Sequence, residues 1–290
     1  MPGMRKFRLS RIAGLAALLG LALLMAAPAV FLLSGALMSS GELGENLGPV
    51  LGGGPGKTDF ARWTLLPREP TLRSEVELLL DSPEFFHMFW NSVKIAAGAL
   101  LGQGLAGAPA AWGFARYRFP GRRAVFGLYI VLMLMPFQVT MLSSYIAIDR
   151  LGLKDSLWAV ILPSAFSTFP VYIMYRSFRS IPEAILESAR LDARNAVQIF
   201  LYIGLPLGSA GVASAMVLGF LECWNLIEQP LAFLRDQSRW PLSLYLPDIG
   251  LARAGPAFAG SLVALVPAVL VFLSGRDFLE QGIVAAAVKE

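Results

Sequence analysis

Six long, largely apolar runs are the feature that most constrains the fold of this chain. They cover residues 12–37, 92–114, 124–148, 157–175, 206–226 and 257–273. A transmembrane helix needs about 20 such residues to cross about 30 Å of hydrocarbon. The sequence therefore predicts an all-α integral membrane protein with six transmembrane helices.

Composition supports this class and argues against an enzyme. Of the 290 residues, 56% are hydrophobic and 15% are charged, whereas about a quarter of a soluble domain is charged. Cys223 is the only cysteine and His87 the only histidine. An internal disulfide and a Cys- or His-cluster metal site are therefore excluded. We expect no catalytic residue, no cofactor site and no metal site in this chain.

The first apolar run resembles a signal peptide at its start. MRKFRLSR precedes it, and Ala27-Pro28-Ala29 is a possible cleavage site. The run continues past that point through FLLSGALM and is too long for the core of a signal peptide. An uncleaved transmembrane anchor is the better interpretation.

Lysine and arginine placement predicts the direction of the spans. If the N-terminus is cytoplasmic, fourteen of the 24 basic residues lie in short inner segments beside the spans. This is the bias expected of cytoplasmic loops, so the net charge of +4 needs no nucleic-acid partner. The expected segments are a cytoplasmic N-terminus 1–11, a first helix 12–37, an extracytoplasmic segment 38–86, a five-helix core 87–275 with a cytoplasmic loop 176–206, and a cytoplasmic tail 276–290. We expect segment 38–86 to begin as a Gly-rich loop and then to turn helical.

No charged residue lies near the middle of a predicted span. Proton- and ion-coupled carriers usually keep such a group at mid-membrane, so a passive conduit or scaffold is favoured over a secondary carrier. Glu222, Trp224 and Asn225 lie towards the outer end of the fifth span and are candidates to line a solute pathway. Trp224 could equally anchor that end of the helix at the membrane interface.

One glycine-rich stretch imitates a nucleotide-binding loop. GGGPGKT, residues 52–58, ends like the phosphate-binding motif, but the position that requires its first glycine is Leu51. A Gly/Pro turn is the simpler reading, so the sequence predicts no nucleotide site here.

A charged segment interrupts the apolar pattern between spans four and five. ESARLDARNAVQIFLYIGLP, residues 187–206, has four charges in its first eight positions. Ser180 and Glu183 have capping-box spacing and Pro182 suits a first helical turn. A helix starting there places Ile185, Ala189 and Ala193 on one small-residue stripe, with Glu187 and Arg190 at i,i+3. Such a helix is suited to dock on another protein.

This segment resembles the cytoplasmic signature of ABC importer permeases, which is Glu-Ala-Ala, three residues, Gly, nine residues, then Ile-x-Leu-Pro. Here Glu187-Ser188-Ala189, Ala193 and Ile203-Gly204-Leu205-Pro206 stand at the same spacing. ARYRFPGRR at 115–123, Trp224-Asn225 and the C-terminal GIVAAAVKE also look like the shorter, six-span permease of maltose-type carbohydrate importers. The resemblance implies a type I ABC importer permease fold with a cytoplasmic coupling-helix loop.

The resemblance also implies which residues meet the ATPase. They are Glu187, Ser188, Ala189, Arg190, Asp192, Ala193, Ile203, Leu205 and Pro206. Ala193 replaces the glycine that makes a turn in the family. If that turn needs a positive φ, Ala193 costs about 1 kcal/mol, unless Asn195 adopts the left-handed conformation in its place.

The partners implied by the resemblance are a homologous second permease, two ATPase subunits, an extracytoplasmic solute-binding protein and membrane lipid. ATP and Mg would be bound by the ATPases and not by this chain. The implied location is a bacterial or archaeal cytoplasmic membrane, with both termini cytoplasmic. A sugar or sugar-like solute follows from the resemblance. An importer of a non-sugar solute, a secondary carrier and a membrane enzyme remain alternatives.

Overall fold

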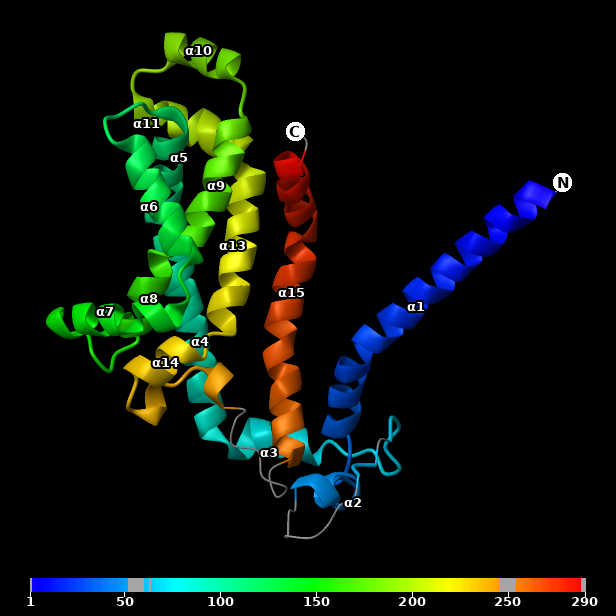
Figure 1. The fold of residues 1–290 in the computed structure, drawn as a ribbon. Helices are drawn as coiled ribbons and strands as arrows, with labels where there is room; N and C mark the ends of the chain where they lie inside the picture. The colour runs from blue at the N-terminus through cyan, green and yellow to red at the C-terminus, as the bar shows by residue number, and fades with distance from the viewer. Residues whose placement is uncertain (1, 52–59, 63, 246–253, 288–290) are drawn as a thin grey trace. The chain divides into compact units, whose positions relative to one another are not determined.

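The computed structural model of the protein describes residues 2–51, 60–62, 64–245 and 254–287. All regular secondary structure in these ranges is helical (Figure 1), which confirms the all-α prediction for the described part of the chain. The glycine-rich stretch 52–58 lies outside the described residues, as does the end of the C-terminal tail, 288–290. The chain divides into two compact units, 1–83 with 246–264 and 84–245 with 265–290.

The first unit contains α1 (Pro2–Ala36), α2 (Ser40–Leu51), α3 (Arg73–Asp81) and the start of α15 (Ala254–Ala287). The prediction that segment 38–86 begins as a Gly-rich loop is wrong, because α2 occupies this stretch. Ser39 accepts a hydrogen bond from the backbone N–H of Glu42 at 3.3 Å. This Ser-x-x-Glu spacing starts a helix that the glycines alone would disfavour.

Short polar links and a small core hold the first unit together. Met38, Leu43 and Ala254 form a buried cluster, and the Phe31 and Phe258 rings pack edge to face with centroids 5.5 Å apart. The backbone of the described residues before α3 is tied to α2, since the N–H of Arg68 donates to the Glu42 carboxylate.

The second unit is a bundle built around α5, α9 and α13. Its core contains Trp112, Met174, Phe178 and Ala215, and its apolar side chains come from segments more than 100 positions apart in sequence. The described elements of this unit are α4 (Pro83–Gly102), η1 (Gln103–Gly107), α5 (Ala108–Arg116), α6 (Arg122–Leu134), α7 (Phe137–Arg150), α8 (Trp158–Ala165), α9 (Thr168–Ser180), α10 (Glu183–Asp192), α11 (Ala196–Ile199), η2 (Phe200–Gly204), α12 (Leu205–Leu207), α13 (Ser209–Trp224), α14 (Glu228–Phe233), η3 (Gln237–Arg239), η4 (Leu242–Leu244) and the remainder of α15.

Two expected spans are bent helix pairs in the structure. The predicted span 124–148 is divided into α6 and α7, which meet at 109°. Pro136 causes the break: Met135 before it is extended, with ψ 127°, as the residue preceding a proline prefers. The predicted span 206–226 falls mainly on α13, and the 196–207 stretch joins it at 74°. The boundaries of these two spans are corrected accordingly.

By length and hydropathy, three described helical segments can cross a membrane, or up to five if each bent pair is one span. The three are Gly14–Ala36, Trp158–Ser180 and Ala254–Glu280. The remaining expected span, 92–114, does not meet this criterion. It falls on α4, η1 and α5, whose helical backbone runs without interruption from Pro83 to Arg116. A count of six stays a prediction.

Two π-helical segments interrupt the helices of the second unit. Each ends two residues before a proline: η1 ends at Gly107 before Pro109, and η2 ends at Gly204 before Pro206. Proline has no N–H to donate to the preceding turn. A locally widened turn is one way for a helix to continue past that missing donor.

Candidate functional site

Helix α10 carries the first half of the segment that the sequence singles out. It lies beyond the ends of α5, α6 and α9 (Figure 1). Pro182 is its N-cap, with φ −60° and ψ 138°, and no side chain caps it. The Ser180 hydroxyl instead donates to the carbonyl of Ser177 at 2.7 Å. The predicted capping box between Ser180 and Glu183 is therefore wrong, because the Ser180 side chain closes the end of α9 rather than the start of α10.

One apolar side chain anchors α10 to the bundle. Leu186 is 1% exposed and belongs to the same buried core as Trp112 and Phe178. Ile181, just before the helix, is also buried there. A leucine buried this fully contributes roughly 2–3 kcal/mol relative to an exposed one. The inner face of α10 is therefore fixed to α5 and α9.

Arg116, the last residue of α5, ties the end of α9 to α10. Its guanidinium donates to the carbonyl of Phe178 and, at 2.6 Å, to that of Ile181. The last carbonyls of a helix lack partners within it, so this arginine supplies the missing donors. Its Nη1 lies 3.2 Å from Glu183 Oε2. Burial lowers the pKa of Arg116, and the Glu183 carboxylate partly opposes this effect.

Glu183 also forms an ion pair with a second arginine, Arg190 of α10. Arg190 Nη2 lies 2.9 Å from Glu183 Oε1, so the expected Glu187–Arg190 pair is wrong. Helical side chains lean towards the N-terminus, and at that end Glu183 is already held by Arg116. Among the described residues Glu187 makes no ion pair.

The outward face of α10 is exposed. It comprises Ala184, Glu187, Ser188 and Leu191, at spacings of three and four residues, with Asp192 beside them. Leu191 is 88% exposed, an unusual position for a leucine on a short polar helix. Ile185 of the expected stripe is 39% exposed, and Ala189 and Ala193 are partly covered. The predicted stripe thus lies at the edge of the exposed face. The sequence did not predict that Leu191 and its neighbours form the centre of that face.

The turn after α10 needs no left-handed residue. Ala193 has φ −83° and ψ 136°, an ordinary extended conformation, so the penalty considered for replacing glycine does not arise. Asn195 is also extended, at φ −155°. Its side chain accepts from the N–H of Gln198 at 2.8 Å and caps α11. Asn195 therefore does not adopt the left-handed conformation considered as an alternative for this turn, and it acts as a helix cap.

The last part of the signature packs back onto the bundle. Ile203 and Leu205 lie against the buried core, while Pro206 is exposed in the first turn of α12. Gly204, which has no side chain, allows the backbone of η2 to pack closely against the ring of Trp112. A Cβ at this position would stand 2.7 Å from Cζ3 of Trp112.

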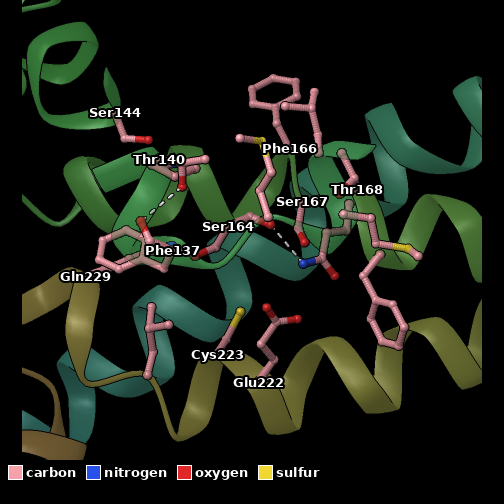
Figure 2. Close-up of a pocket in the computed structure, with 17 residues that line it drawn as sticks. Phe137, Thr140, Ser144, Ser164, Phe166, Ser167, Thr168, Glu222, Cys223 and Gln229 are labelled. Carbon is pink, nitrogen blue, oxygen red and sulfur yellow. Dashed lines mark hydrogen bonds between the residues drawn. The ribbon is translucent and has the colours of Figure 1, made fainter. Parts of the chain in front are cut away.

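A cavity of about 330 Å³ lies within the same unit, where the helices break. Gln103, 1% exposed, donates to the carbonyl of Ser164 at 2.9 Å and so occupies the break between α8 and α9. Figure 2 shows Glu222 and Cys223 pointing from α13 towards Ser164 and Ser167. The wall is mixed, with hydroxyls and amides beside aromatic and sulfur-containing side chains.

The three pathway candidates are placed differently. Glu222 lines the cavity and is the only carboxylate among the described residues of its wall. Trp224 is 5% exposed and stacks on Phe220 with ring centroids 5.3 Å apart. The Asn225 side chain donates to the carbonyl of Leu221 at 2.9 Å. Neither Trp224 nor Asn225 is among the residues that line this cavity.

Residues 103–284 match the family described as "Binding-protein-dependent transport system inner membrane component". This match covers more than half of the chain. It includes the whole 181–206 loop and the helices that form the cavity.

Individual proteins are similar over much of the chain. The lactose transport system permease protein LacG of Rhizobium radiobacter is 28% identical over 206 residues, covering 69% of this chain and 74% of that one. The arabinooligosaccharides transport system permease protein AraQ of Bacillus subtilis (strain 168) is 28% identical over 288 residues and 98% of both chains. A chain in the crystal structure of a bacterial ABC transporter that imports the acidic polysaccharide alginate superimposes with a TM-score of 0.78. It is 20% identical and covers 94% of this chain and 97% of that chain, so it supports the type I importer permease fold.

Proposed function

Because this chain belongs to the family of binding-protein-dependent transport system inner membrane components, we propose that it is one of two permease subunits of an ATP-driven carbohydrate importer. The solute class is supported by its relatives, which include a lactose and an arabinooligosaccharides transport system permease protein. The subunit performs no chemistry. Its ATPase partners bind ATP and Mg and hydrolyse the nucleotide.

The observation that carries this proposal is the two-sided construction of α10. Its inner face is fixed by the buried Leu186 and by Arg116, which grips both α9 and Glu183. Its outer face exposes Glu187, Ser188 and Leu191, and among the described residues Glu187 forms no ion pair. A helix held this firmly transmits a push on its outer face to α5 and α9.

In the proposed mechanism, the outer face of α10 docks in a cleft on one ATPase subunit. Leu191 supplies apolar area, and Glu187 offers a carboxylate to a basic group. When two ATPases close on ATP, α10 moves with its ATPase as a rigid body. The attached helices then shift the pathway between inward-facing and outward-facing states.

The cavity lined by Glu222 is the proposed position of the solute pathway in this subunit. Its hydroxyl and amide groups suit the many hydroxyls of a sugar. An extracytoplasmic binding protein delivers the solute, and a homologous second permease completes the pathway. Both termini face the cytoplasm, which places α10 on the side where ATP is available.

The proposal is tested by purifying the tagged importer from detergent and scoring the ATPase subunits that co-purify and the ATP-driven uptake of labelled oligosaccharide. Wild type should retain its ATPases, and Glu187→Arg should lose them or lose uptake. Glu69→Arg is the matched control, because it makes the same charge change at an exposed residue of the segment expected outside the cell.

Two outcomes would redirect the assignment. Uptake by wild type with no ATPase present contradicts the importer proposal and favours a secondary carrier. A partner binding protein that carries a non-sugar ligand, identified by mass spectrometry after its release, retains the importer but overturns the carbohydrate assignment.

A further inference from the structure

The connection between α5 and α6 lies at the α10 end of the bundle (Figure 1). A second cavity is lined by residues of this connection and of α9. Its volume is about 930 Å³. Four arginines line it, namely Arg118, Arg122, Arg123 and Arg179, together with the aromatic rings of Phe126 and Tyr175. None of the described residues that line this cavity is acidic. It is separate from α10 and from the cavity that contains Glu222.

The four guanidiniums have no counter-charge in the described chain. None of them takes part in an ion pair with the described carboxylates. Arg179 donates to the hydroxyl of Tyr175 at 2.9 Å, and Arg122 donates to the carbonyl of Tyr117 at 3.4 Å. These neutral acceptors orient two of the side chains and leave all four charges uncompensated. Like charges around one cavity repel one another, and a bound anion relieves that repulsion.

The N-terminus of α6 adds further positive charge beside this cavity. Gly121, at φ 78°, is its N-cap and supplies no side-chain acceptor. The sequence then places Arg122 and Arg123 in the first turn, where the positive end of the helix dipole disfavours cations. Among the described residues, the backbone N–H groups of Arg123 and Ala124 donate to no backbone carbonyl outside the helix. Guanidiniums and free N–H groups therefore converge on one place.

Apolar side chains continue directly from this basic site along α6. Val125, Leu128 and Leu132 are 46%, 58% and 42% exposed and share one face of the helix, at spacings of three and four residues. A free phosphate ion would use the arginines and leave this face uncovered. A molecule with an anionic head and long acyl chains would cover both.

We propose that this cavity binds the headgroup of an anionic phospholipid of the cytoplasmic leaflet. The phosphate accepts from the guanidiniums of Arg118, Arg122 and Arg123, which suit phosphate because they donate in pairs. The acyl chains lie along the exposed face of α6. Basic pockets beside transmembrane helices on the cytoplasmic side are suited to such headgroups. The site holds a lipid and is independent of which solute the importer carries.

The test uses the full importer in nanodiscs that contain phosphatidylcholine and a minor share of phosphatidylglycerol. Native mass spectrometry then counts the lipids that stay bound as the complex is stripped of the rest. Wild type should retain phosphatidylglycerol in preference to phosphatidylcholine. The triple variant Arg118→Gln/Arg122→Gln/Arg123→Gln should lose affinity for phosphatidylglycerol by about fivefold for each arginine removed.

Three comparisons keep the result specific. Arg68→Gln/Arg73→Gln/Arg150→Gln removes the same charge from segments outside this cavity and should retain the lipid as wild type does. Replacing the three cavity arginines by lysine keeps the charge but not the paired donors, and should give intermediate retention. Thermal unfolding of each variant in pure phosphatidylcholine checks that it is folded.

The proposal is overturned if the cavity variant and the matched control retain phosphatidylglycerol equally. It is also overturned if millimolar inorganic phosphate displaces the retained lipid completely, since the site would then take free phosphate. Loss of ATPase subunits from the cavity variant in lipid-free detergent, with lipid retention unchanged, would identify the surface as a protein contact instead.

Discussion

Arg116 and Glu183 are 67 positions apart in the chain, and their side chains meet at 3.2 Å where three helices converge. The guanidinium also donates to the carbonyls of Phe178 and Ile181 at the end of α9. One side chain thus connects α5, the end of α9 and the start of α10. The pair lies behind the face that we propose as the ATPase contact, not in it.

Removing Arg116 should loosen α10 without touching its outer face. We expect Arg116→Met to lower the free energy of unfolding by about 1–3 kcal/mol, because buried carbonyls lose their donor. Arg116→Lys should restore part of this. Arg190→Met removes the other, exposed partner of Glu183 and should cost less than about 1 kcal/mol. Thermal unfolding in detergent ranks the variants, and equal losses for Arg116→Met and Arg190→Met would contradict this account.

Two leucines five positions apart on α10 should behave in opposite ways. Leu186→Ala opens a void in the core and should cost about 2–5 kcal/mol of stability. Leu191→Ala should leave stability nearly unchanged, because that side chain is 88% exposed, yet it should weaken co-purification of the ATPase. Unfolding temperature and pull-down yield, measured on both variants, separate the two roles. A stability loss as large for Leu191→Ala as for Leu186→Ala would refute the assignment of faces.

The close packing of η2 on Trp112 predicts a penalty for one methyl group. Gly204→Ala places a Cβ 2.7 Å from the indole ring and should destabilise the protein by about 1–3 kcal/mol. Gly113→Ala, in the interior of α5 with nothing within 4 Å of its Cβ, should be neutral or stabilise by about 0.5–1 kcal/mol. Unfolding temperatures of the two variants should therefore shift in opposite directions, or only Gly204→Ala should shift.

The turn at Asp236 predicts a dependence on pH at the loop before η3. Hydrogen bonds from the side chain and backbone of Ser238 lower the pKa of the Asp236 carboxyl. Because the folded pKa lies below the unfolded one, the contribution of Asp236 is fully present above about pH 4 and is lost as the pH falls through the folded value. The pKa of Asp236, followed by carboxyl carbon NMR, should rise towards that of free aspartate in Ser238→Ala. An unchanged value would contradict the hydrogen-bond origin.

The sequence predicts the fold class because a long apolar run in a membrane forms a helix. It does not predict the bends within two of the expected spans. Pro136 sits near the middle of an unbroken apolar run, and hydropathy does not register a missing N–H. The helix α2 was missed for a related reason: its glycines suggest a loop, whereas the Ser39-x-x-Glu42 cap, which decides the outcome, contributes nothing to composition.

The sequence identified the segment that we propose as the ATPase contact, but it did not predict which face of α10 packs on the bundle. Spacing identified Glu187–Pro206 as the segment of interest, and the family resemblance named its residues. Which side of α10 faces the bundle depends on Leu186 entering a core made by α5 and α9, and on Arg116 from a helix far away in sequence. Such long-range contacts leave no periodic signal. The position of Arg116 at the end of an apolar segment is the only indication in the sequence of its role as a hydrogen-bond donor to the end of another helix.

The two π-helical segments set the angular phase of the helices that contain them. A π turn holds one residue more than an α turn, so every side chain beyond it is rotated by about 100° relative to a continuous α-helix. Across η1, the side chains of α4 and those of α5 therefore do not share one helical wheel. Loss of a single residue from Gln103–Gly107 would swing the Arg116 end of α5 round its axis by that angle. The length of this segment therefore sets the direction in which Arg116 points towards Glu183.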